Sequence, residues 1–135
     1  MKKDVESFLA AARALIGVPF VHQGRSEHGI DCIGLVVLAG KTCGIDTSAD
    51  ITNYSRTPHG VLLPLLKQAL DPVDGEICPG DLLVFRFKHE PMHIGIWTGS
   101  TLIHTFATIG RVVEHELDDR WKAMVVCAYR FKEFA

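Results

Sequence analysis

The spacing of apolar residues changes once along this chain, and the change limits the folds that the chain can adopt. Apolar side chains recur at helical spacing over 4–16, 32–42 and 58–70. From Pro72 onward the apolar runs are short and separated by turns, which predicts strands over 81–87, 93–97, 101–106, 110–115 and 124–131. Helices followed by a strand meander predict an α+β fold, with N-terminal helices packed on an antiparallel sheet of about five to six strands.

Length and composition indicate one globular domain. The 135 residues can bury about two-thirds of their unfolded surface, and no linker or repeat divides them, so we expect a single domain over 1–135. Apolar residues make up 47% and charged residues 22%, as in ordinary soluble proteins. The net charge of -2 argues against nucleic acid or an anionic membrane as the main partner.

The chain starts with a charged segment that leads directly into an amphipathic stretch. It has neither the apolar core nor the cleavage site of a signal peptide, and no membrane-spanning segment, so we expect synthesis in the host cytoplasm. The cysteines lack short paired spacings, which predicts free thiols at Cys32, Cys43, Cys78 and Cys127.

Residues 29–36 place a cysteine at the start of the second predicted helix. Asp31 is a good N-cap, so Cys32 falls at the first helical position. The positive end of the helix dipole favours the thiolate there, and the free amides can hold the oxyanion of a tetrahedral intermediate. From these residues alone, a reactive thiol and a buried apolar filler explain Cys32 equally well.

Two histidines lie on neighbouring predicted strands. If Gly99 and Ser100 form a hairpin turn, residues whose numbers sum to about 199 pair across it, which makes His93 a diagonal neighbour of His104 on one face. Singly, each is more simply a half-exposed strand histidine. Together they supply the base and the orienting partner that a cysteine nucleophile needs. Gly95 leaves space on that face, which suits a docking helix terminus.

Metal and phosphate sites fit the sequence poorly, and we expect neither a metal nor a cofactor. His89 and His93 have helical spacing, but Pro91 lies between them, and no Cys-x-x-Cys occurs. The glycines over 24–29 lack the Lys-Ser/Thr ending of a phosphate-binding loop.

Five segments, taken in order, resemble the signature of the NlpC-type cell-wall cysteine peptidases. They are Gly17-Val18-Pro19-Phe20, the segment 29–36, Pro79-Gly80-Asp81-Leu82-Leu83-Val84-Phe85, His93-Ile94-Gly95-Ile96-Trp97-Thr98-Gly99 and Leu102-Ile103-His104-Thr105. The resemblance extends over residues 5–131. The small size looks most like the branch encoded among the tail genes of bacteriophages and gene transfer agents.

This resemblance implies a rearranged papain-like fold and a peptidoglycan hydrolase. It implies that Cys32 is the nucleophile, His93 the general base and acid, and His104 the third polar residue. The implied substrate is a peptidoglycan stem peptide, cut between γ-D-glutamate and a diamino acid without a metal. It further implies a virion tail component that acts in the cell wall or periplasm, with other tail-tip or hub proteins as partners.

Two positions depart from the family's pattern. Phe20 stands where the family commonly has Tyr, and Ile33 where Ser usually follows the catalytic Cys. The candidates for substrate binding are these two residues, Asp31, and the nearby His22 and Gln23, which can replace the missing donor. Asp31 either binds a substrate amine or only caps the helix. Two other functions stay open: a structural tail-tip component without hydrolysis, and an amidase or acyltransferase on the same scaffold.

Overall fold

The computed structural model describes residues 3–47, 62–87 and 90–134. Most of the turn-like segment that the sequence predicts over 45–57, and the start of the helix predicted over 58–70, lie outside these residues.

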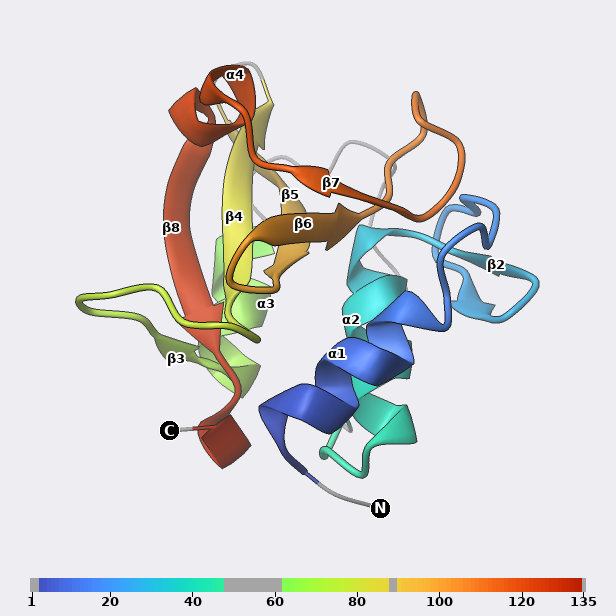
Figure 1. The fold of residues 1–135 in the computed structure, drawn as a ribbon, viewed down its shortest axis with the longest axis horizontal. Coiled ribbons are helices and arrows are strands. Elements are labelled where there is room, and N and C mark those ends of the chain that lie inside the picture. The colour runs from blue at the N-terminus through green and yellow to red at the C-terminus, as the bar shows by residue number, and fades with distance from the viewer. Residues whose placement is uncertain (1–2, 48–61, 88–89, 135) are drawn as a thin grey trace.

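A layer of helices packs against one antiparallel sheet (Figure 1), which confirms the predicted α+β class. Helix α1 (Val5–Arg13) lies beside α2 (Cys32–Thr42), and α3 (Leu62–Ala69) contacts the sheet at β5. The sheet has six strands in the order β3-β8-β4-β5-β6-β7. Their bounds are β3 (Asp71–Pro72), β4 (Leu82–Phe87), β5 (Glu90–Trp97), β6 (Thr101–His104), β7 (Val113–Glu116) and β8 (Val125–Arg130).

The first two helices form where local signals start and stop them. The Asp4 carboxylate caps α1 by accepting a hydrogen bond from the Ser7 amide at 2.8 Å. Helix α1 ends at Arg13, before the predicted end at residue 16, because the next residues tighten into i to i+3 turns. Helix α2 has the predicted bounds and ends before Gly44, whose φ of +87° suits glycine.

The sheet separates two apolar clusters. Alternate residues of the central strands, among them Val84, Ile94 and Ile103, face the helices and form the larger cluster with Leu35 of α2. The other residues of the same strands face away and form a smaller cluster around Leu83, Phe85, Leu102 and Ala128. The short helix α4 (Asp119–Ala123) contributes Trp121 to this second cluster. The two faces of β5 therefore lie in different surroundings.

The hairpin between β5 and β6 has the predicted register. Ile96 pairs with Ile103 and Trp97 with Leu102, so the numbers of each pair sum to 199. Gly99 occupies the turn with a φ of +104°, a conformation that glycine adopts readily.

Several short elements were not predicted. The segment 17–31, expected to be an irregular loop, contains a hairpin of β1 (Arg25–Ser26) and β2 (Gly29–Ile30). Strand β3 pairs with β8, and α4 precedes β8. The bounds of the predicted strands also differ: β5 already begins at Glu90, β6 ends at His104, and β7 begins only at Val113.

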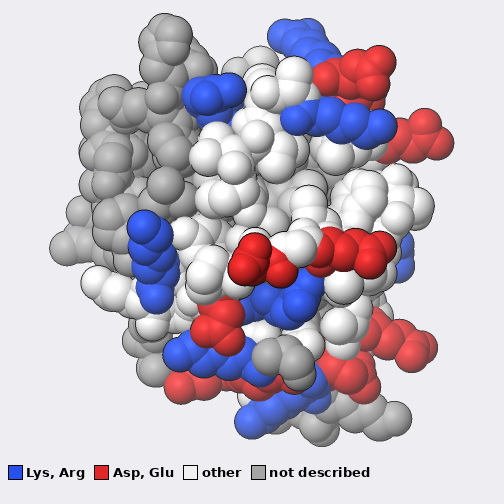
Figure 2. Space-filling model, turned by 90° about the vertical axis from the view of Figure 1, so that its left-hand side faces the viewer, with Lys and Arg blue, Asp and Glu red and all other residues white. Residues whose placement is uncertain are grey.

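Charge on the molecular surface is mixed. Figure 2 shows acidic and basic side chains interspersed over the face that it displays. Among the described residues, none of the helices combines the length and apolar content needed to cross a bilayer.

Candidate active site

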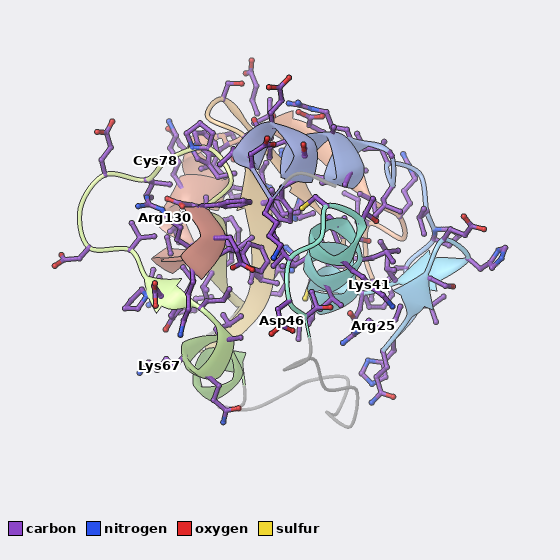
Figure 3. The ribbon with its side chains drawn as sticks, turned by 90° about the horizontal axis from the view of Figure 1, so that it is seen from below. Arg25, Lys41, Asp46, Lys67, Cys78 and Arg130 are labelled. Carbon is purple, nitrogen blue, oxygen red and sulfur yellow. The ribbon has the colours of Figure 1, made fainter. Side chains whose placement is uncertain are left out.

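Asp31 fixes the start of α2, as predicted. Its carboxylate accepts a hydrogen bond from the Gly34 amide at 2.8 Å, which is N-cap geometry. The same carboxylate accepts a hydrogen bond from the Gln23 amide and pairs with the Arg25 guanidinium, each at 2.9 Å. Asp31 is only 4% exposed. Figure 3 shows Arg25 at the end of the molecule formed by the β1–β2 hairpin, beside α2.

The loop before Cys32 lies directly against the first turn of α2. A Cβ added to Gly34 would lie 2.2 Å from the Gly24 carbonyl oxygen, so only glycine fits there. Gln23 adopts a φ of 62°, which is unusual for a residue with a side chain, and the bond from its amide to Asp31 holds it there.

Cys32 lies close to β5, the strand that carries His93. The backbone amides of Ile94 and Ile33 act on the Cys32 sulfur and lower its pKa, and Ile94 directly follows His93. The β5–β6 ladder ends at the Ile96–Ile103 pair, before it reaches Ile94. The fold therefore brings the cysteine at the start of α2 to the backbone next to His93.

The expected thiolate is not favoured in the free protein. Burial raises the pKa of the Cys32 thiol to about 12, and the negative charge of Asp31 raises it further. The amides of Ile94 and Ile33 and the charge of Arg25 lower the pKa, but by less. Loss of hydration thus outweighs the helix N-terminus, and the resting group is a neutral thiol.

His93 and His104 lie side by side, as their spacing predicts. His93 Nε2 and His104 Nδ1 are 2.8 Å apart, and the two residues are 1% and 0% exposed. The expectation that a helix terminus fills the space at Gly95 is wrong. A Cβ there would lie 2.6 Å from Leu102 Cδ1 and 3.2 Å from His104 Cβ, so side chains of β6 fill this space.

Both rings are neutral near pH 7. Burial lowers the pKa of His93 well below its usual value of 6.5, and the nearby His104 lowers it further. Burial, together with the neighbouring His115, lowers the pKa of His104 to about 3. A neutral imidazole has one N–H donor and one nitrogen that accepts, so the tautomer of each ring decides which of its nitrogens is free.

A third histidine, His115 on β7, continues this arrangement. His104 Nε2 and His115 Nε2 are 2.7 Å apart, and His115 Nδ1 lies 2.7 Å from the Glu116 carbonyl oxygen. Sequence reasoning did not single out His115. The diagonal rule that pairs His93 with His104 also applies here, because Leu102 is the partner of His115. The diagonal pairing of His104 with His115 follows only from the register between β6 and β7, which the sequence does not provide.

Aromatic rings surround the buried histidines. Phe87 stacks on His93 with ring centroids 4.9 Å apart and planes 11° apart. Trp121 meets His104 edge-on at 4.8 Å, and Phe106 lies against both histidines. These apolar neighbours keep water away from the rings, which accounts for the lowered pKa values.

The predicted substrate-binding residues lie in the segment before and at the start of α2. Phe20 is half-buried, forms a bridge with Ile30, and donates its amide to the Gly110 carbonyl. Half-buried His22 and Gln23 follow it, and Gln23 reaches Asp31. Ile33 packs partly against the helix-facing cluster. Their roles in substrate binding stay predictions.

Metal ligands do not gather in the described part of the chain. Within 3–47, 62–87 and 90–134, no group of three or more His, Cys, Asp or Glu side chains is placed to hold a metal ion. His89, which the zinc alternative needs, lies outside these residues.

The model of one protein family, the NlpC/P60 family, matches residues 17–130. This chain belongs to the NlpC/P60 family. The matched part of this NlpC/P60 chain contains Cys32, His93, His104 and His115.

Solved structures of NlpC/P60 proteins have the same papain-like arrangement of helices on a sheet. The NlpC/P60 domain of the peptidoglycan hydrolase SagA is 22% identical, with a TM-score of 0.68 over 94% of this chain and 98% of that domain. The peptidoglycan hydrolase RipB from Mycobacterium tuberculosis is 21% identical, with a TM-score of 0.66 over 93% of this chain and 63% of that one. These likenesses confirm the predicted fold.

Longer NlpC/P60 proteins contain this fold as one part. A family member from Bacillus cereus is 22% identical, with a TM-score of 0.72, and the match covers 94% of this chain but 40% of the other. A lipoprotein-like member from Staphylococcus aureus gives a TM-score of 0.69 at 20% identity over 94% and 41% of the two chains. This chain thus spans about 40% of the length of these two proteins.

Proposed function

We propose that this chain is a peptidoglycan hydrolase, a cysteine endopeptidase whose nucleophile is Cys32, whose base is His93 and whose orienting residue is His104. One observation carries the proposal. In a chain of the NlpC/P60 family, the cysteine at the start of α2 meets β5 beside a buried histidine that is hydrogen-bonded to a second histidine. Two of the structural neighbours, SagA and RipB, are peptidoglycan hydrolases by name.

The mechanism starts from a neutral pair, because the pKa of the thiol is raised and that of His93 is lowered. His93 takes the Cys32 proton as the sulfur attacks the amide carbonyl, so the charges form during the attack. Amides at the start of α2, that of Cys32 among them, stabilise the oxyanion. The His93 imidazolium then protonates the leaving amine. Water, activated by His93, hydrolyses the thioester and frees the sulfur.

We propose the bond between γ-D-glutamate and the diamino acid of the stem peptide as the scissile bond, and residues 1–135 as one catalytic domain. The proposed setting is a phage or phage-like tail tip, beside other tail-tip or hub proteins, with action in the cell wall or periplasm. The resemblance of the ordered sequence segments supports this bond and setting. Asp31 and the segment around Phe20 are the proposed substrate contacts.

Digestion of defined muropeptides tests the proposal. We expect the wild-type protein to release the peptide fragments and Cys32→Ala to lose activity by about 10³-fold or more. Cys127→Ala is the matched control, because Cys127 is also a half-buried free thiol but lies on β8. Full activity in Cys32→Ala would remove Cys32 as the nucleophile.

Mass spectrometry of the products separates the open alternatives. A cut next to the diamino acid supports the endopeptidase. A cut at another amide, or a transferred acyl group, indicates the amidase or acyltransferase. A folded wild-type protein that cuts no muropeptide indicates a structural tail-tip component.

A further inference from the structure

The three histidines form a continuous hydrogen-bonded chain across three strands. The chain runs from His93 on β5 through His104 on β6 to His115 on β7, with nitrogen separations of 2.8 and 2.7 Å. It ends 2.7 Å from the carbonyl oxygen of Glu116. A carbonyl oxygen can only accept a hydrogen bond, so His115 Nδ1 carries the proton at this end.

That one assignment determines the proton positions in the whole chain. When His115 carries a single proton, on Nδ1, its Nε2 has a lone pair, so His104 Nε2 donates to it. His104 Nδ1 is then an acceptor, so His93 Nε2 donates to it. Nδ1 is left as the one nitrogen of His93 that can take a proton from Cys32.

We propose that His115 is a positioning residue for this reaction: by bridging His104 to the Glu116 carbonyl, it holds His93 in the tautomer that acts as the base. The inference rests on the proposed function, because the tautomer matters only if His93 is the base. It gives His115 a role that needs no contact with the substrate.

The surroundings of His115 suit this role. Among the described residues, its ring contacts are His104, Trp121 and the Glu116 carbonyl, and its partner across the ladder is Leu102. It is half-buried, whereas His93 and His104 are buried. His115 is thus the outer end of the chain, and it can be changed with less disturbance than the inner rings.

Three substitutions of His115 separate positioning from packing. In His115→Gln the side-chain oxygen can still accept from His104 Nε2, and we expect kcat within about threefold of wild type. In His115→Phe the ring volume stays, but the acceptor for the His104 Nε2 proton is lost. We expect kcat to fall about 10- to 100-fold. In His115→Lys the ammonium can only donate, which reverses the chain, and we expect a loss of about 10³-fold or more.

We expect these substitutions to lower kcat and to leave KM nearly constant, because His115 does not contact the substrate in this proposal.

Nitrogen-15 NMR of the imidazole rings supplies a readout independent of activity. In the wild-type protein we expect His93 to carry its proton on Nε2. In His115→Lys we expect it on Nδ1. A wild-type spectrum with the proton on Nδ1 would overturn the inference even if every variant failed to fold.

The outcomes also separate this inference from the proposed function. If Cys32→Ala stays active while the His93 tautomer responds to His115→Lys, the proposed function fails and the positioning geometry stands. If Cys32→Ala is inactive while His115→Phe and His115→Lys change neither kcat nor the His93 spectrum, the positioning role fails and the proposed function stands. Thermal unfolding of each variant confirms that the compared proteins are folded.

Discussion

At the scale of single residues, the candidate nucleophile and the candidate base are both uncharged before a substrate binds. The pKa of Cys32 is raised by burial and by Asp31, while burial lowers the pKa of His93. A thiolate–imidazolium pair is therefore disfavoured in the free protein. In the proposed mechanism, attack of the sulfur on the substrate carbonyl drives the proton transfer from Cys32 to His93.

Alkylation of Cys32 by iodoacetamide should be slow at pH 7 and should rise with pH through pH 10, because the thiolate fraction grows about tenfold per pH unit below the pKa. Asp31→Asn keeps an N-cap but removes the negative charge that raises the Cys32 pKa, so it should speed alkylation at pH 8. Mass spectrometry of the labelled peptides distinguishes Cys32 from exposed Cys78.

The control for this experiment is Asp71→Asn, an exposed residue on β3 at the far edge of the sheet, which should leave the rate unchanged. Fast alkylation of wild-type Cys32 at pH 6 to 7 would contradict the neutral resting thiol.

The sequence pattern predicted which two histidines lie side by side, but it did not predict the ionisation of the site residues. The sum of residue numbers across the Gly99 turn is a local property, and it placed His93 beside His104. The pKa of Cys32 depends on how deeply the whole fold buries the sulfur. The spacing of residues in the sequence does not predict that burial. His115 depends on the register of a strand separated from β6 by an irregular segment.

At the scale of elements, the start of α2 is determined by contact with the loop before it. The Asp31 cap, the Arg25 ion pair and the close approach of Gly24 to Gly34 all join the same few residues. This contact sets where the first turn of α2, and therefore Cys32, lies relative to the sheet.

Gly34→Ala should destabilise the protein by about 1–3 kcal/mol, because its Cβ would lie 2.2 Å from a backbone oxygen. Gly40→Ala, in the same helix, meets side-chain atoms only at 3.5 Å and beyond, so it should be neutral or stabilising by up to about 1 kcal/mol. Urea unfolding of both variants measures the difference. Equal stability of the two variants would show that the loop can move away from α2.

Helix α2 was predictable because its signals are local: an Asp cap at one end and Gly44 at the other. The β1–β2 hairpin was not, because tertiary contacts hold it. A Cβ on Gly29 would lie 2.2 Å from the Val21 side chain, for example. Helix α4 has five residues, which is too short for a helical period to be visible in the sequence.

At the scale of the whole molecule, burial of two histidines makes folding depend on pH. The pKa values of His93 and His104 are lower in the folded protein than the usual value of 6.5, so the unfolded chain binds more protons below that pH. Stability should therefore be greatest above pH 6.5 and should fall as the pH falls below it.

The expected loss is about 1.4 kcal/mol per pH unit for each of these two histidines once the pH is well below 6.5. Urea unfolding at intervals between pH 5 and pH 7.5 measures it. His104→Gln should reduce the slope, because one of the two groups is gone. His28→Gln is the control, since the His28 side chain is 88% exposed. A stability that stays level from pH 7.5 to pH 5 would contradict the burial of both rings as neutral groups.

The sequence pattern predicted the class of the fold and the meander β4-β5-β6-β7, because turns between neighbouring strands leave local signals. The return of β8 to lie between β3 and β4 has no such signal, since it joins strands that are far apart in the chain. The size and the hydrophobic pattern of the chain are compatible with several positions of the last strand in the sheet, and packing selects one of them.

The candidate nucleophile and the candidate base are anchored in different layers of the molecule. Cys32 packs with the side chains beneath the helices, whereas His93 is surrounded by the rings on the opposite side of the same strands. The proposed reaction therefore requires both layers to be intact at once. If the proposed function holds, a mild denaturant that loosens either layer should abolish muropeptide cleavage while most of the backbone still gives a native spectrum. Loss of cleavage would then be the first sign of partial unfolding.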